Sequence, residues 1–149
     1  MDTKTTLDDW LNKGWLVKHR PERREIRELL AIADRDIADS QAKEISTDTR
    51  LGLAYNAALQ LAVAALVASG YRSGREAHHY RAIQSLAFTI GASTDLVDQL
   101  DGFRKKRNIS DYERAGAVSE QEAMEMLTLA RTLRQMMTAW LKKNHPEFI

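Results

Sequence analysis

The chain has 149 residues, of which 44% are hydrophobic and 29% are charged, a composition of one globular domain rather than of a disordered or fibrous chain. Its 22 Lys and Arg residues nearly balance its 21 Asp and Glu residues, so with a formal charge of +1 any attraction to nucleic acid or membrane must come from local patches. Cysteine is absent, which excludes disulfides, thiolate zinc sites and cysteine nucleophiles and suits a cytoplasmic location.

The first residues lack the apolar core of a secretory signal. The most apolar run, 51–69, contains Asn56 and Gln60 and is rich in alanine. It therefore falls short of the roughly 20 strongly apolar residues that a membrane-spanning helix needs. We interpret it as a buried helix and expect no membrane partner.

Apolar residues recur at helical spacing along the whole chain, and no alternating β-branched run indicates a strand. Thr6 and Asp9 form a capping box for a short first helix, which Gly14 ends. A second helix follows Pro21, with an apolar face over 26–37. Its wet face offers two ion pairs at i,i+4, namely Arg24 with Glu28 and Arg35 with Asp39.

The third predicted helix covers about 50–69, with Asp48 as its candidate cap and Gly70 near its end. Because it is apolar on nearly every side, we expect it either at the centre of the bundle or at a subunit interface. Asn56 and Gln60 lie one turn apart on this helix and need polar partners when buried. They could form a polar network at an interface, but such residues more often satisfy each other and the nearby backbone.

Three further helices are marked by capping residues at their starts and by glycine or polar residues at their ends. The fourth begins with a capping box, the fifth with a hydroxyl cap, and the sixth with a second capping box before a long helix to about 144. These signals are Ser73 with Glu76 and Gly91 for the fourth helix, Ser93 or Thr94 and the polar stretch 114–118 for the fifth, and Ser119 with Glu122 for the sixth.

The connections between the predicted helices are short, so consecutive helices are expected to pack side by side in opposite directions. We predict an all-α fold, an antiparallel up-and-down bundle of four to five main helices over residues 21–149. Residues 1–20 are predicted to form a short helical extension at the N-terminus.

Four consecutive cations lie near the end of the fifth predicted helix, and an asparagine follows them. Arginine offers planar donors that fit phosphate oxygens, and lysine adds a point charge. This pattern favours a site for RNA or a nucleotide, and a solvated run that complements the helix dipole is the alternative. The candidate nucleic-acid-binding residues are Arg104, Lys105, Lys106, Arg107 and Asn108.

Arg107, Asp111 and Tyr112 are the candidate catalytic residues. Arg107 can stabilise charge on a phosphate, or it can form an ordinary i,i+4 ion pair with Asp111. Tyr112 is a poor general base, because a phenol with a reference pKa near 10 is rarely deprotonated at neutral pH. His78 and His79 offer imidazoles, although His79 shares the apolar stripe of its helix and suits a structural role.

Metal and cofactor motifs do not occur in the sequence. The two adjacent histidines point about 100° apart on a helix and do not form a chelating pair. There is no phosphate-binding glycine loop and no nucleophile elbow. We expect neither a metal nor a cofactor.

The segment 49–149 combines an Ala-rich helix that contains Tyr and Asn, a helix with adjacent histidines, and an Arg-Asn-x-x-Asp-Tyr element. These elements are Ala54-Tyr55-Asn56-Ala57-Ala58-Leu59-Gln60, Ala64-Ala65-Leu66, Gly70-Tyr71, His78-His79, Arg104-x-x-Arg107-Asn108-x-x-Asp111-Tyr112, and Ala123 with Ala130. In this combination the segment resembles the HEPN superfamily of small helical-bundle domains.

The resemblance implies an antiparallel bundle of four or five helices that forms a homodimer. Many members of the superfamily are metal-independent ribonucleases, toxins or defence components, often with a nucleotidyltransferase-like antitoxin as partner. In active members an arginine and, after about four to six residues, a histidine form a site that is doubled across the dimer interface. Arg107 matches the arginine and Asn108 the polar residue after it, whereas Tyr112 stands in place of the histidine.

Three functions remain open at this point. The first is a HEPN-like dimer, weakly catalytic or non-catalytic, that binds RNA, a nucleotide or a partner protein. The second is a metal-independent endoribonuclease in which Arg107 stabilises the transition state and His78, His79 or Asp111 replaces the missing histidine. The third is a structural interaction domain whose apolar third helix mediates dimerisation or docking.

Overall fold

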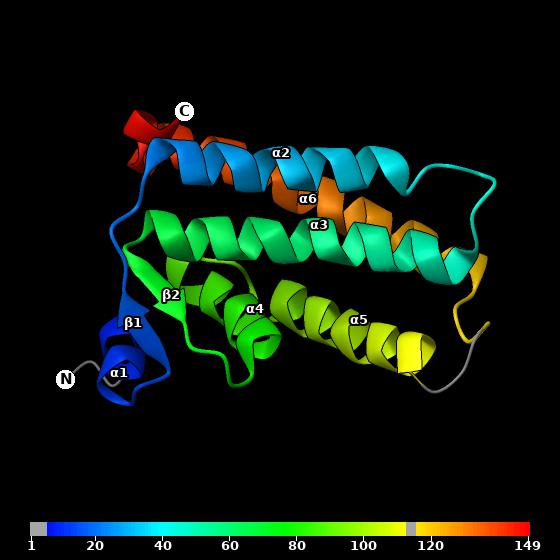
Figure 1. The fold of residues 1–149 in the computed structure, drawn as a ribbon, viewed down its shortest axis with the longest axis horizontal. Coiled ribbons are helices and arrows are strands. Elements are labelled where there is room, and N and C mark those ends of the chain that lie inside the picture. The colour runs from blue at the N-terminus through cyan, green and yellow to red at the C-terminus, as the bar shows by residue number, and fades with distance from the viewer. Residues whose placement is uncertain (1–5, 113–115) are drawn as a thin grey trace.

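The computed structural model describes residues 6–112 and 116–149, and within 109–112 it describes the backbone only. The chain is mostly helical, which confirms the predicted all-α fold (Figure 1). In chain order the elements are α1 (Leu7–Asn12), β1 (Leu16–Lys18), α2 (Arg23–Asp39), α3 (Thr47–Ala68), β2 (Tyr71–Ser73), α4 (His78–Thr89), α5 (Thr94–Tyr112), α6 (Glu120–Asn144) and a short 3₁₀ helix, η1 (Pro146–Phe148).

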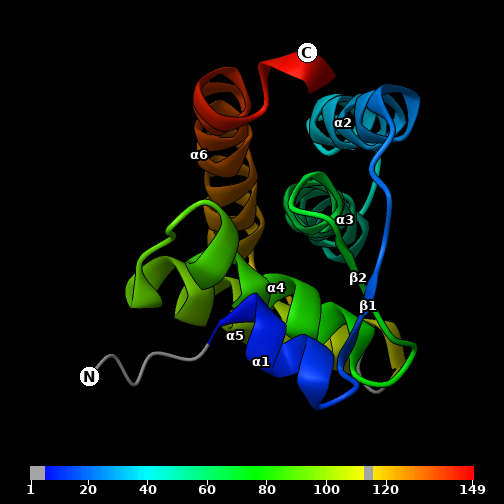
Figure 2. The same cartoon turned by 90° about the vertical axis from the view of Figure 1, so that its left-hand side faces the viewer.

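Helix α3 forms the centre of the bundle. It contacts α2, α6, α4 and α5, with α2 on one side and the α4–α5 pair on the other (Figures 1 and 2). Thirteen of its residues are buried, including Tyr55, Leu61 and a series of alanines that let the neighbouring helices approach closely. The predicted central position is therefore confirmed. This chain itself covers most of the helix surface.

Within the described residues, α3 is also the helix that is long and apolar enough to cross a membrane by length and composition alone. However, 72% of its most apolar window is buried inside the bundle. A core helix passes the same composition test, and this degree of burial is what a core helix shows.

The direction of the chain alternates along the main helices, but contacts do not simply follow chain order. Helices α2 and α3 run in opposite directions side by side, as expected for a short connection (Figure 1). Helix α6 instead returns to pack against α3 and α2, and η1 packs on α2 (Figure 2). The core consequently lies between α3, α2 and α6, and α4 with α5 covers the remaining face of α3.

A two-stranded antiparallel sheet was not predicted. Leu16 of β1 pairs with Ser73 of β2, and Lys18 pairs with Tyr71, so the sheet ties the N-terminal segment to the connection between α3 and α4. Each strand has only three residues, too few for an alternating pattern to show in the sequence. The predicted capping box of Ser73 and Glu76 is wrong, because Ser73 belongs to β2 and Ala77 precedes the first residue of α4.

Most of the predicted helix ends are confirmed. Both remaining capping boxes form as expected, and glycines follow the helices at the predicted places with positive φ angles. The serine before α5 accepts a hydrogen bond from a backbone N–H of its first turn. These residues are Thr6 with Asp9, Ser119 with Glu122, Gly14, Gly70, Gly91 and Ser93; the predicted polar stretch 114–118 lies partly outside the described residues.

Two side-chain predictions need correction. Ser46, and not Asp48, caps α3, because the hydroxyl of Ser46 accepts the N–H of Thr49 at 3.1 Å. Asp48 instead accepts the N–H of Gly116 at 2.7 Å. Arg35 donates to the adjacent Asp36 at 3.0 Å rather than to a residue one turn away, whereas the predicted pair of Arg24 and Glu28 forms at 2.9 Å. Asp39 was the partner expected for Arg35.

Candidate functional site

The four consecutive cations of α5 point in different directions, because successive residues on a helix are about 100° apart. Arg104 donates through Nε to Asp101 at 2.7 Å, and the Nζ of Lys105 lies 3.5 Å from the other oxygen of that carboxylate. Lys106 pairs with Glu122 of α6 at 3.2 Å. The run is thus partly neutralised by acids and divided between several faces.

Arg104 faces a cleft of about 400 Å³ between α5 and the start of α4. The cleft gathers two arginines, two imidazoles, a phenol ring and an amide on one small surface. Its lining residues are Arg75, Ala77, His78, His79, Tyr80, Arg104 and Asn108. Of the five candidate nucleic-acid-binding residues, Arg104 and Asn108 line this cleft, one helical turn apart.

The start of α4 is shaped by an unusual backbone at Ala77, which precedes the first helical residue with φ 53° and ψ 35°. Residues other than glycine rarely adopt this left-handed backbone conformation, so the surrounding contacts must stabilise it at Ala77. One such contact is the hydrogen bond between the hydroxyl of Ser73 in β2 and Nδ1 of His78. The sheet therefore fixes where α4 begins and where both histidines lie.

His79 connects the cleft to the core. Its Nδ1 lies 3.3 Å from the hydroxyl of Tyr55 on α3, and the guanidinium of Arg107 lies 5.6 Å from the centre of the Tyr55 ring. Three side chains from α3, α4 and α5 therefore meet in one cluster. The sequence separates them widely, and packing on α3 brings them together.

Burial and the arginines keep both histidines neutral. The pKa of His79 is lowered first by burial and then by the charges of His78, Arg107 and Arg104, and the pKa of His78 is lowered by burial and by Arg72. Burial raises the pKa of Tyr55 to about 12, with Arg107 and Arg104 acting in the opposite direction. At neutral pH the cluster thus holds uncharged imidazoles and a protonated phenol.

Arg107 lies on the other side of α5 from Lys105 and lines a second cleft of about 400 Å³ between α2, α3 and α5. Asp36, Asp48 and Asn56 line the same cleft. Asp36 is only 2% exposed and accepts a hydrogen bond from Asn56 at 2.6 Å. Arg107 therefore belongs to a polar region at the side of the core, next to the cluster with Tyr55.

The predicted bond between the two polar residues of α3 is confirmed, since Gln60 donates to Asn56 at 3.3 Å. The sequence did not indicate that Asp36 would complete this chain of bonds. Asp111 and Tyr112 end α5, and their side chains lie outside the described part of the structure, so their predicted catalytic role stays a prediction.

Arg75, Tyr80 and Tyr55 were missed as site residues. Arg75 lies in the connection between β2 and α4, where only the adjacent Gly74 marked a turn, and the position of that connection depends on the unpredicted sheet. Tyr80 is 42% exposed, and the guanidinium of Arg104 lies 5.4 Å from the centre of its ring. An aromatic residue directly after the two adjacent histidines was the available signal.

No group of three or more metal-ligating side chains occurs among the residues whose placement is described. No protein-family model matches the chain, and a comparison with curated proteins gives no match either. The chemistry of the cleft between α4 and α5 is therefore the basis for a functional assignment.

Proposed function

We propose that the protein is a HEPN-like helical subunit that binds the phosphate backbone of single-stranded RNA, or of a nucleotide, in the cleft between α4 and α5. The observation that carries the proposal is the convergence of Arg75, Arg104 and Asn108 with an exposed aromatic ring in one hollow. Arginine donors and an amide fit phosphate and sugar oxygens, and an exposed ring offers a base a surface on which to stack.

The arrangement of Arg104 supports this role. Its Nε is engaged by Asp101, which fixes the plane of the guanidinium, and arginine has four further N–H donors. The guanidinium also lies beside the ring of Tyr80. One nucleotide could therefore contact both side chains, with its base on the Tyr80 ring and its phosphate at Arg104. The resemblance to HEPN domains further suggests a homodimer, with a nucleotidyltransferase-like antitoxin as a candidate partner.

A second function, metal-independent cleavage of RNA, is favoured by the position of His79. In the tautomer with the proton on Nδ1, the Nδ1–H donates a hydrogen bond to the Tyr55 oxygen. Nε2 then keeps the lone pair that a general base needs. The neutral imidazole would accept the proton of a ribose 2′-hydroxyl as that oxygen attacks the adjacent phosphorus. The P–O5′ bond would break to give a 2′,3′-cyclic phosphate, and the leaving 5′-oxygen would take a proton from water. Arg104 would stabilise the charge that develops on the phosphate. In this scheme His79 of α4 supplies the imidazole that is missing at Tyr112.

Binding is tested by fluorescence anisotropy with a short labelled single-stranded RNA of mixed sequence. Arg104→Gln is expected to weaken binding about fivefold, as the loss of one partly exposed charged hydrogen bond. It should also reduce the slope of log affinity against log salt by about 0.7, as expected for one lost phosphate contact. Arg131→Gln removes an exposed guanidinium of α6 away from the cleft and serves as the matched control. Equal affinity of both variants and wild type would rule out the cleft as the RNA site.

Cleavage is tested by incubating the same RNA with wild type, with and without chelator, and with His79→Gln. The catalytic proposal expects cleavage that survives chelation and disappears in His79→Gln while RNA affinity is retained. No cleavage by wild type, together with intact RNA binding, would leave the non-catalytic binding function. The same samples in light scattering report whether the protein is a dimer.

A further inference from the structure

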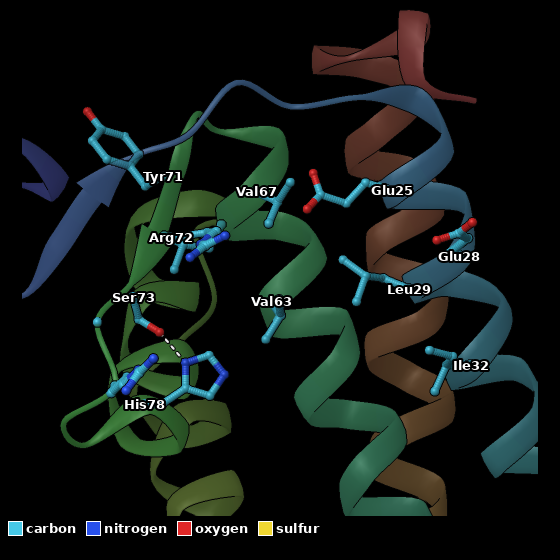
Figure 3. A pocket seen from close by; sticks show the side chains of 13 residues that line it. Glu25, Glu28, Leu29, Ile32, Val63, Val67, Tyr71, Arg72, Ser73 and His78 are labelled. Carbon is cyan, nitrogen blue, oxygen red and sulfur yellow. Dashed lines mark hydrogen bonds between the residues drawn. The ribbon is translucent and has the colours of Figure 1, made fainter.

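Another hollow, outside the proposed RNA cleft, also borders on the connection between β2 and α4. It has a volume of about 570 Å³, within the range of small-molecule sites, and lies between α2, α3 and β2 (Figure 3). Its floor is aliphatic and comes from two helices: Leu29 and Ile32 of α2, and Val63 and Val67 of α3. A hollow of this shape suits an apolar ligand body.

The rim of this hollow carries Glu25 and Glu28 on the α2 side and Arg72 on the β2 side (Figure 3). Arg75, in the connection after β2, also lines it. Both acids already have side-chain partners from this chain. Glu25 bonds Nε2 of His19 at 2.7 Å, and Glu28 bonds Arg24 at 2.9 Å.

The arginines differ from the acids in this respect. Arg72 and Arg75 are exposed, and among the residues that the structure describes neither forms an ion pair. The neighbouring His78 is held by Ser73 with its pKa lowered, so it offers a neutral N–H donor rather than a charge. The rim therefore presents two arginines that form no ion pair among the described residues, and these guanidinium groups favour an anionic group.

We propose that this hollow binds an anionic amphiphile, with its apolar body on the aliphatic floor and its carboxylate or phosphate headgroup at Arg72 and Arg75. Burial of an alkyl or aromatic body contributes about 25 cal/mol for each Å² of apolar surface removed from water, which drives binding. The headgroup adds charge-assisted hydrogen bonds and sets the selectivity. The site is distinct from the RNA cleft, although Arg75 and His78 line both hollows.

The test uses the full chain and the fluorescent probe anilinonaphthalenesulfonate, whose aromatic body and sulfonate match the proposed ligand. Octyl phosphate is expected to displace the probe, while inorganic phosphate, octanol and octyltrimethylammonium displace it at least about tenfold more weakly, because each lacks one of the two recognised features. Sonicated vesicles that contain an anionic lipid form a further arm, which separates a free amphiphile from a membrane surface.

Two variants test whether the ligand binds in this hollow. Arg72→Gln removes a cation that lines only this hollow and should weaken octyl phosphate binding about tenfold without changing RNA affinity. Ile32→Trp fills the floor and should abolish probe binding, with circular dichroism confirming an unchanged helical fold. Arg131→Gln is again the control. Arg104→Gln, which lines only the RNA cleft, should leave the amphiphile bound.

Three results would overturn the proposal. They are displacement by octyltrimethylammonium as efficient as by octyl phosphate, unchanged octyl phosphate affinity in Arg72→Gln, and binding to anionic vesicles without binding of the monomeric amphiphile. Weaker RNA binding in Arg104→Gln with unchanged amphiphile binding supports both sites separately, so a failure of one proposal is distinguishable from a failure of the other.

Discussion

Replacing Asn56 by aspartate tests the polar network between α2 and α3. In the wild-type chain the Asn56 amide donates to the buried carboxylate of Asp36 at 2.6 Å. The variant keeps the size of the side chain but turns the donor into a second carboxylate. We expect a large loss in the free energy of unfolding at neutral pH and a much smaller loss under acidic conditions.

The magnitude follows from two limits. Loss of a hydrogen bond to a charged group costs about 1.5–3 kcal/mol. Two charges about 4 Å apart repel by about 4 kcal/mol at an effective dielectric constant of about 20. The pair can escape this repulsion by binding a proton, which costs about 4 kcal/mol at pH 7 for a carboxyl with a reference pKa near 3.9. The expected loss at pH 7 is therefore about 2–4 kcal/mol.

The pH dependence has a definite sign. A shared proton means that the folded variant binds more protons than the unfolded chain, so its stability falls as pH rises. At about pH 4.5 the cost of protonation is below about 1 kcal/mol, and most of the electrostatic penalty should disappear.

The assay is urea denaturation of wild type and variant at both pH values, followed by circular dichroism. Gln99→Glu is the matched control, because Gln99 donates to Asp95 at 3.0 Å in the same way but on an exposed helix face. There the change should cost only about 0.2–0.5 kcal/mol. A cost for Asn56→Asp no larger than for this control, or one that does not shrink on acidification, would refute the argument that Asp36 is desolvated.

Three further predictions concern the core, a helix cap and pH. Leu133→Ala, at a fully buried position of α6, should lower the free energy of unfolding by about 2–5 kcal/mol in urea titrations, and a loss under about 1 kcal/mol would contradict the described core. Ser119→Ala removes the capping box of α6 and should cost about 1 kcal/mol by the same assay, more than Ser93→Ala if both box bonds matter. Because the pKa of His79 is lowered in the folded chain, the unfolded chain binds more protons below about pH 6.5. Stability should therefore fall as pH decreases from about 7 to about 5, and His79→Gln should flatten this dependence; an unchanged slope would count against a partly buried, neutral imidazole.

The helices could be predicted because their signals are local. A capping box needs only two residues three positions apart, and a glycine with positive φ needs no distant partner, so Ser119 with Glu122 and Gly70 were identified correctly. Asp48 was misread because aspartate and serine are both good caps, and the sequence around Ser46 does not show which one enters the helix.

The candidate site was only partly predictable. Arg104 and Asn108 were named from the basic run. The pairs of Arg104 and Lys105 with Asp101 are local, since Asp101 lies one turn earlier on α5, but the sequence does not show that Lys106 would pair with Glu122 of α6. The Lys106–Glu122 contact depends on how α5 is rotated against its neighbours, which the packing of the helices determines.

The sequence by itself determined the all-α class, the ends of most helices and the burial of α3, because each follows from the period of apolar residues and from hydrogen bonds within a single turn. Tertiary structure alone decided that β1 and β2 pair, that Asp36 meets Asn56, and that His79 lies beside Tyr55. These contacts join residues far apart in the chain. They stabilise the fold only after the helices have packed together, so no pattern within one segment of the sequence predicts them.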